Sequence, residues 1–169
     1  MRMRIFDKKS HRLALYNYNQ NGVFFITICT LDRKKILSRI AVETPLPGCP
    51  GPPKIELLRH GSIADRYIHQ LNSFYDHLSV EKYVIMPDHI HLLIAVNGHP
   101  GMDAPAKRTS LIGQFVGTLK RFCNREYGEN IWQNGYYDHV VRNQTDYDSI
   151  WEYIDHNPHK WILKNQDRE

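Results

Sequence analysis

This sequence of 169 residues has few cysteines, and it lacks both long apolar runs and the pattern of a secretion signal. Its three cysteines, Cys29, Cys49 and Cys123, form no CxxC pair, and the start MRMRIFDKKSHR lacks the apolar core of a signal peptide. No apolar run approaches the roughly 20 residues needed to cross a bilayer. We therefore expect a soluble protein in the reducing cytoplasm, without disulfide support.

Charge and composition leave several functions open. The formal net charge of +4 suits a polyanionic partner, but many proteins that never contact nucleic acid share it. Ten histidines and ten tyrosines supply groups that bind metals, move protons, stack on bases or act as nucleophiles. The length indicates a single domain, 1–169, that holds the whole function.

Proline is concentrated in one segment, TPLPGCPGPPK, where five of the nine prolines lie between Pro45 and Pro53. Proline removes amide donors and restricts φ, which disrupts helices and central strands. We predict a surface loop at about 44–54 that separates two structured regions.

Hydrophobic spacing predicts the remaining elements. The β-branched and aromatic run Gly22–Thr30 indicates a central strand, and Pro87-Asp88 indicates a tight turn between two antiparallel strands. Helical spacing of apolar residues, with caps, predicts three helices. The predicted elements are a strand at Gly22–Thr30, a helix at about Ser62–Asp76, strands at Val80–Met86 and His89–Val96, a helix from an N-cap at Thr109 or Ser110 to Gly128, a strand at Gly135–Asn143, and a helix opened by Thr145-x-x-Asp148 and ended near Asn157-Pro158.

The order β-α-β-β-α-β-α matches a ferredoxin-like fold of the α+β class. This fold is a βαββαβ antiparallel sheet with helices on one face, here followed by an additional C-terminal helix. The other face of the sheet is then free to hold a site. Because unrelated functions use this fold, the function must be argued from the site residues.

Two histidines lie one residue apart in the strand HIHLLIAV. Alternation along a strand points His89 and His91 to the same face, with Ile90 and Leu92 on the other. They are either partly buried histidines bonded to the backbone or to Asp88, or a pair of metal ligands. A metal site needs at least one more ligand and room for substrate.

The last predicted helix carries a tyrosine and an asparagine four residues apart, Tyr153 and Asn157, along the edge of its apolar stripe. A phenol oxygen can attack an electrophile, and an amide oxygen can bind a hard cation. The alternative is that Tyr153 lies at the boundary of the core and Asn157 only ends the helix before Pro158.

Three segments, from about Arg12 to Trp161, resemble one family. The segments NQNGVFFITICT, PDHIH and IWQNGYYDHVVRNQTDYDSIWEYIDHNPHKW are similar to the REP-associated tyrosine transposases, which are HUH single-strand DNA transposases related to the insertion-sequence enzymes. The resemblance implies that His89 and His91 hold a divalent metal, Mg²⁺ or Mn²⁺, with Asn157 as third ligand. It also implies that Tyr153 is the catalytic nucleophile, in preference to Tyr136, Tyr137 and Tyr147.

The implied activity is metal-dependent cleavage and strand transfer of single-stranded DNA through a 5′-phosphotyrosine. The expected partner is single-stranded or hairpin DNA, and the chain is expected to be a monomer or homodimer. A set of basic and aromatic side chains is expected to contact phosphates and bases: Lys107, Arg108, Lys120, Arg121, Arg125, Trp132, Tyr136, Tyr137 and Arg142. The alternative is a non-transposing DNA-binding protein of the same fold that recognises structured repeats. A ferredoxin-like RNA binder is disfavoured, because the central strands lack an aromatic RNP pattern.

Overall fold

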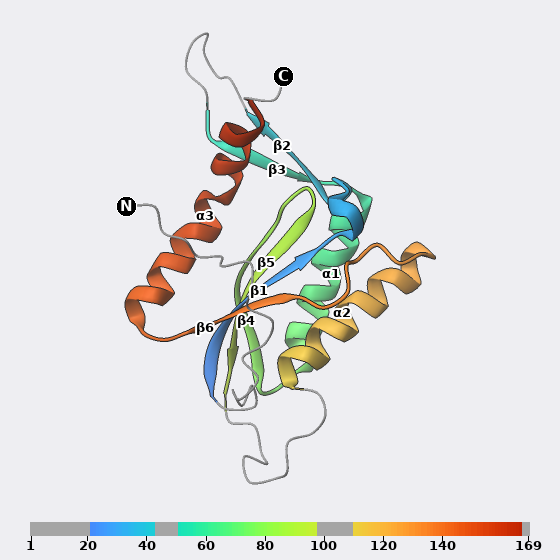
Figure 1. The fold of residues 1–169 in the computed structure, drawn as a ribbon. Helices are drawn as coiled ribbons and strands as arrows, with labels where there is room; N and C mark the ends of the chain where they lie inside the picture. Colours follow the sequence, from blue (N-terminus) through green and yellow to red (C-terminus); the bar gives the residue numbers. More distant parts are fainter. Residues whose placement is uncertain (1–20, 43–50, 98–109, 167–169) are drawn as a thin grey trace.

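A four-stranded antiparallel sheet forms the centre of the protein (Figure 1). The computed structural model describes residues 21–42, 51–97 and 110–166. The strand order is β4-β5-β1-β6, and each neighbouring pair is antiparallel. The strands are β1 (Gly22–Cys29), β4 (Leu78–Ile85), β5 (His89–Val96) and β6 (Tyr137–Val141), and the helices are α1 (Arg59–Phe74), α2 (Leu111–Tyr127) and α3 (Gln144–Gln166).

This strand order and the helices between the strands give the ferredoxin-like fold that the sequence predicts. The first strand, β1, lies between β5 and β6, and the hairpin partner β4 lies at the edge. The crossover from β1 to β4 contains α1, and the crossover from β5 to β6 contains α2. The predicted α+β class, with an additional C-terminal helix, is confirmed.

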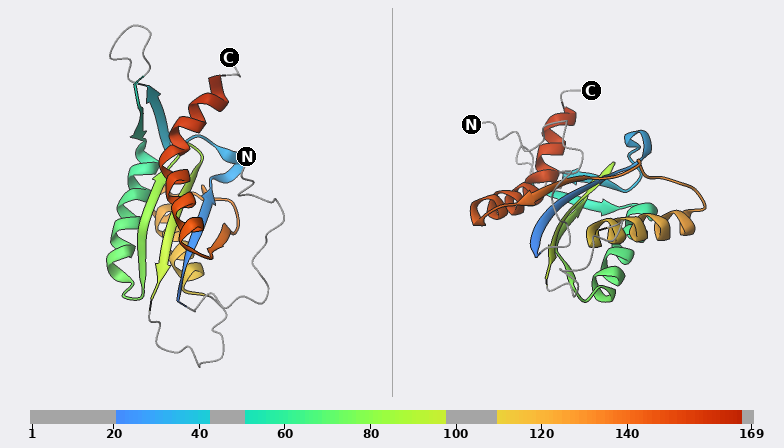
Figure 2. Two further views of the ribbon diagram at one scale, coloured as in Figure 1. Left: turned by 90° about the vertical axis from the view of Figure 1, so that its left-hand side faces the viewer. Right: turned by 60° about the horizontal axis from the view of Figure 1, so that its bottom comes forward.

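The two faces of the sheet have separate cores. On one face, alternate residues such as Phe24, Ile26 and Leu92 pack against α1 and α2. On the other face, Phe25 and Leu93 pack against α3 in a smaller apolar cluster. Figure 2 shows α1 and α2 on one side of the sheet and α3 on the other. The face that the sequence leaves open for a site is therefore partly covered by α3.

A second, two-stranded sheet was not predicted. It consists of β2 (Ser38–Val42) and β3 (Pro53–Leu57), which pair from Ser38 opposite Leu57 to Val42 opposite Pro53. The C-terminal boundary predicted for the proline-rich loop, about 44–54, is therefore too late, because Pro53 and Lys54 belong to β3. Proline is tolerated as the first residue of a strand, where no ladder donor is needed. Residues 43–50 lie outside the described residues.

The ends of the helices agree with the prediction only in part. Ser110 caps α2 by accepting a hydrogen bond from the Gly113 N–H, and Gly128 ends it with a φ of 82°. Helix α1 begins at Arg59, before the expected start near Ser62. Helix α3 is capped by Asn143, whose Oδ1 accepts from the Asp146 N–H, so the predicted Thr145-x-x-Asp148 cap is wrong.

The predicted end of the last helix at Asn157-Pro158 is also wrong. Helix α3 continues through Pro158 to Gln166. Proline removes one amide donor within a helix, a cost that tertiary packing can offset. Here Trp161, in the turn after Pro158, packs against the apolar cluster between α3 and the sheet. The continuation adds residues to the wall of the site described below.

No helix in the described ranges combines the length and the apolar character that a membrane crossing requires.

Candidate active site

The pairing of β1 with β5 places the site residues side by side on the α3 face of the sheet. Thr27 lies opposite His91, and Cys29 lies opposite His89. From the other side, β6 places Tyr137 opposite Thr27. Directly opposed residues of an antiparallel pair point to the same face. Two cross-strand rows therefore converge on the same region.

The two imidazoles face each other through their Nε2 atoms, which lie 3.1 Å apart. Each Nδ1 atom is held from behind by another side chain. His89 Nδ1 lies 2.6 Å from an Asp88 carboxylate oxygen, and His91 Nδ1 lies 2.8 Å from the Thr27 hydroxyl. Metal-binding histidines are typically oriented in this way, through the nitrogen that does not bind the metal. The pair is thus oriented to present both Nε2 atoms to one ligand.

The turn between β4 and β5 is held by the segment that follows β1. The Thr30 N–H and hydroxyl both donate to the Asp88 carbonyl, and the Leu37 N–H donates to the Pro87 carbonyl. The Arg33 guanidinium forms a 3.0 Å ion pair with the Asp88 carboxylate through Nε and donates to Cys29 Sγ through Nη1. These contacts fix Asp88, and Asp88 in turn orients His89.

Arg33 reaches this position from an unusual backbone conformation. Asp32 and Arg33 have φ values of 54° and 55°, in the left-handed region that few residues other than glycine adopt. Two such residues in succession form a strained turn, which the hydrogen bonds to the Pro87-Asp88 turn hold in place.

Helix α3 places the tyrosine and asparagine over the histidines. The Tyr153 ring centroid lies 5.4 Å from that of His91, and its edge-to-face contact with Phe25 has a centroid distance of 5.9 Å. Asn157, only 7 % exposed, forms a hydrogen bond to the Tyr153 phenol through its side chain. All four residues of the predicted catalytic and metal set therefore meet in one place, within a single chain.

A cavity of about 560 Å³ connects these residues with the surface. It contains the predicted catalytic and metal residues and a group of basic and aromatic side chains. The lining residues are Thr27, Cys29, Arg33, His89, His91, Tyr137, Tyr153, Asn157, Lys160, Trp161 and Lys164.

Burial determines the protonation of the site. It lowers the pKa of His89, against the opposing effect of Asp88, and it lowers the pKa of His91 well below its ordinary value. Both imidazoles are therefore neutral near pH 7, as metal ligands must be. Burial also raises the pKa of Tyr153, while the Asn157 hydrogen bond and the charge of Arg33 oppose this rise.

The residues present fit a divalent cation. Within the described ranges, no cluster of three or more His, Cys, Asp or Glu side chains is placed to hold a metal. Among the described residues, a third protein ligand beside His89 and His91 would be of another type, and the amide oxygen of the buried Asn157 has the hard character that Mg²⁺ or Mn²⁺ prefers.

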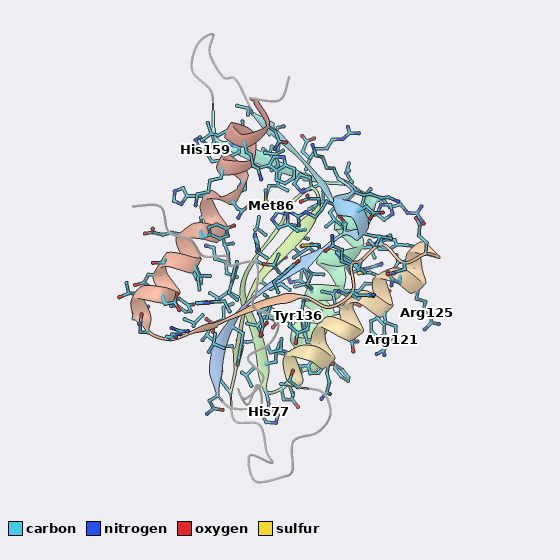
Figure 3. The ribbon with its side chains drawn as sticks, viewed as in Figure 1. His77, Met86, Arg121, Arg125, Tyr136 and His159 are labelled. Atoms are coloured by element: carbon cyan, nitrogen blue, oxygen red, sulfur yellow. The ribbon has the colours of Figure 1, made fainter. Side chains whose placement is uncertain are left out.

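None of the predicted DNA-binding residues on α2 lines this cavity. Helix α2 covers the opposite face of the sheet, and Figure 3 shows Arg121 and Arg125 there, away from α3. Lys120 instead braces the loop before β6, because its ammonium group donates to the carbonyls of Gln133 and Gly135. Burial lowers the pKa of Lys120 to about 8. Lys107 and Arg108 lie outside the described residues.

The other residues predicted to contact DNA differ in exposure and in position. Trp132 is only 2 % exposed and belongs to the core under α1 and α2, so the prediction that it stacks on bases is wrong. Tyr136 is half-buried against the same core. Tyr137 is 53 % exposed and lines the cavity, and the exposed Arg142 lies at the end of β6 beside Asp146.

Of the described cavity residues, six were missed by sequence reasoning: Thr27, Cys29, Arg33, Lys160, Trp161 and Lys164. Three of them follow Pro158, where the helix was expected to end. Their spacing from Tyr153 and Asn157 continues one helical stripe, which extending the helix past Pro158 would have revealed. Arg33 depends on a turn that leaves no recognisable pattern in the sequence.

Comparison with known proteins confirms the resemblance and the fold. No family model matches the chain. An uncharacterised protein of Haemophilus influenzae is 27 % identical over 93 % of this chain and 91 % of its own length. A second protein of that organism, provisionally named a REP-associated tyrosine transposase, is 26 % identical over 85 % of this chain and 74 % of its own length.

A solved structure of a REP-associated tyrosine transposase bound to a REP hairpin has the same fold. Its TM-score is 0.59 at 18 % identity, and the match covers 89 % of this chain and 73 % of that one. The chain therefore resembles the REP-associated tyrosine transposases in sequence and shares their fold.

Proposed function

We propose that this protein is a metal-dependent enzyme that cleaves and rejoins single-stranded DNA through a covalent bond to Tyr153. The observation that carries the proposal is the meeting of Tyr153 and Asn157 with the paired Nε2 atoms of His89 and His91 in one cavity. The likeness to a transposase solved with a REP hairpin supports single-stranded or hairpin DNA as the substrate.

The reaction that this site would perform is a phosphoryl transfer without an external energy source. The Tyr153 phenol oxygen attacks a backbone phosphorus, an oxygen–phosphorus bond forms, and the bond to the 3′-oxygen breaks. The phenol loses its proton and the 3′-oxygen gains one, leaving a 5′-phosphotyrosine and a free 3′-hydroxyl. Attack by a 3′-hydroxyl on the phosphotyrosine reverses these bonds, which permits joining to another strand.

His89, His91 and Asn157 would hold the cation. When bound, a divalent metal supplies positive charge against the extra negative charge that develops on the phosphoryl oxygens. Asp88 and Thr27 hold the two rings in place through their Nδ1 atoms. A site oriented before substrate arrives loses little energy to rearrangement.

Tyr153 enters the reaction as a neutral phenol, because burial raises its pKa. The phenol must therefore lose its proton as it attacks. The Asn157 hydrogen bond and the charge of Arg33 both favour the phenolate and thus assist that loss. This gives Asn157 a contact with the nucleophile as well as a place in the metal site.

The test is covalent trapping of DNA. The protein is incubated with a labelled single-stranded or hairpin oligonucleotide and Mg²⁺ or Mn²⁺, and adducts are separated under denaturing conditions. Wild type and the matched control Tyr147→Phe, on the same helix, are expected to form the adduct, whereas Tyr153→Phe forms none. An adduct that persists in Tyr153→Phe would show that Tyr153 is not the nucleophile. Tight DNA binding without any adduct or cleavage supports the non-transposing DNA-binding alternative.

A further inference from the structure

The part of α3 beyond Pro158 forms one wall of the cavity. Lys160, Trp161 and Lys164 line it together with Tyr153 and Asn157. These five positions have the spacing of one face of a helix. The wall therefore continues from the proposed nucleophile toward the end of α3.

The charge of this wall has a single sign. Among the described residues that line the cavity, the permanently charged ones are all basic, namely Arg33, Lys160 and Lys164, which we call the basic rim. The Lys160 ammonium lies 4.6 Å from the centroid of the Tyr153 ring. Among the described residues, no carboxylate pairs with Lys160 or Lys164, whereas Lys82 on β4 pairs with Asp155 elsewhere on α3. Arg33 is paired with Asp88, so the positive charge of the rim that no described carboxylate pairs with is that of Lys160 and Lys164 on α3.

An aromatic side chain lies within the rim. Trp161 is half-buried, its ring centroid lies 6.1 Å from that of His89, and the Lys35 ammonium lies 5.7 Å from the indole centroid. The exposed Tyr137 lines the same cavity from β6. Basic groups that follow a backbone, combined with aromatic rings that stack on bases, are the features that bind single-stranded nucleic acid.

We propose that the basic rim and Trp161 are the binding track for a DNA single strand. The rim residues contact the phosphates on either side of the bond to be cut, and the indole stacks on a neighbouring base. The inference rests on the proposed function and adds the residues that position the strand. It differs from the sequence-based prediction, in which basic residues of α2 contact the DNA.

The position of α2 favours a binding track on α3 over one on α2. Arg121 and Arg125 lie on the side of the sheet covered by α1 and α2, whereas the cavity opens on the side of α3 (Figure 3). A strand bound along α2 would have to pass around an edge of the sheet to reach Tyr153. A strand bound along the face of α3 that carries Lys160 and Lys164 would reach Tyr153 without leaving that face.

The experiment measures binding apart from catalysis. Fluorescence anisotropy with a labelled single-stranded oligonucleotide of mixed sequence is recorded in EDTA over a series of salt concentrations. Each phosphate contact on a single strand contributes about 0.7 to the slope of log K against log salt. The double variant Lys160→Gln/Lys164→Gln should lower the slope by about 1.4. The matched variant Arg121→Gln/Arg125→Gln should leave it unchanged.

Trp161 is tested in the same assay. Trp161→Leu should weaken binding about tenfold without changing the salt slope, because stacking involves no counterion release. Trp161→Phe, which keeps an aromatic face, should restore most of the affinity. Circular dichroism melts show whether each variant is folded, and the single change Lys164→Glu at an exposed position repeats the charge test with little structural risk.

The outcomes separate the inference from the proposed function. If wild type forms the covalent adduct but only the α2 variant loses affinity, the binding track is wrong and the proposed function stands. An unchanged salt slope in both Lys164→Glu and the folded α3 double variant overturns the track as well. If wild type neither binds the oligonucleotide nor forms an adduct, the proposed function itself fails.

Discussion

The Nε2 atoms of His89 and His91 lie 3.1 Å apart, within hydrogen-bond distance, although both atoms are proposed metal ligands. The Asp88 carboxylate can only accept, so His89 carries its proton on Nδ1. The proton between the two rings then belongs to His91, whose Nδ1 accepts from the Thr27 hydroxyl. Binding of a cation by both Nε2 atoms requires His91 to move that proton to Nδ1. Thr27 can serve both states, because a hydroxyl donates or accepts.

Replacing Thr27 by valine tests this arrangement. Valine keeps the shape but leaves His91 Nδ1 without its partner, so we expect Mn²⁺ affinity to fall about tenfold or more. Titration calorimetry measures the change. Thr27→Ser keeps the hydroxyl and should retain affinity near that of wild type. Equal Mn²⁺ affinity in wild type and Thr27→Val would show that this hydrogen bond does not orient His91.

The place of the histidine pair could be predicted from the sequence, because strand alternation alone puts His89 and His91 on one face. The approach of Tyr153 and Asn157 could be predicted only through family resemblance, since neither has a distinctive local pattern. Arg33 could not be predicted, because its position depends on two residues of positive φ and on hydrogen bonds to a turn far along the chain. Propensity alone placed the end of α3 wrongly, because packing of Trp161 outweighs the local effect of Pro158.

Lys120 shows why basic residues on a helix are difficult to interpret from sequence. It was predicted to contact DNA, but its ammonium group holds the carbonyls of Gln133 and Gly135. Lys120→Met should lower the free energy of unfolding by about 1–2 kcal/mol, because two charge-assisted hydrogen bonds to carbonyls are lost, one of them partly buried. The exposed control Arg121→Gln should change it by less than about 0.5 kcal/mol. The free energies of unfolding of both variants in urea show whether Lys120 stabilises the loop before β6 or is an ordinary surface lysine.

Asp146 should make stability depend on acid pH. Burial opposes ionisation, but the His139 hydrogen bond, the Arg142 N–H and nearby positive charge together lower the pKa of Asp146 below its ordinary value of 3.8. Because the folded pKa is the lower one, the stabilisation is complete above the ordinary pKa and is lost as pH falls through the folded value. Asp146→Asn should therefore cost about 1 kcal/mol at pH 7 and progressively less toward about pH 3.

Denaturant unfolding at several pH values measures this difference. Asp148→Asn is the matched control, because Asp148 lies near the same helix end but is exposed and bonds only to Gln144 among the contacts of the described residues. Its effect should be smaller at pH 7. If the cost of Asp146→Asn does not change with pH, the carboxylate charge does not stabilise the junction between β6 and α3.

Substitution by alanine should have opposite effects at two helical glycines, Gly61 and Gly117. A Cβ atom on Gly61 of α1 would lie 2.0 Å from the Leu37 carbonyl oxygen, which already accepts from the Leu58 N–H. Leu37 also holds the Pro87 carbonyl beside the histidine turn, so the backbone there cannot move freely. Gly61→Ala should therefore destabilise the protein by about 1–3 kcal/mol.

At Gly117 of α2, a helix-interior position, the same change meets no described atom within 4 Å outside the backbone of its own helix. Gly117→Ala should raise the free energy of unfolding by about 0.5–1 kcal/mol, because alanine loses less backbone freedom on folding. Urea unfolding of the two variants gives the comparison. Because Leu37 supports the turn that carries Asp88 and His89, Gly61→Ala should also weaken Mn²⁺ binding, whereas Gly117→Ala should not. Destabilisation of Gly61→Ala with unchanged Mn²⁺ affinity would show that the turn keeps its geometry when the Leu37 segment shifts.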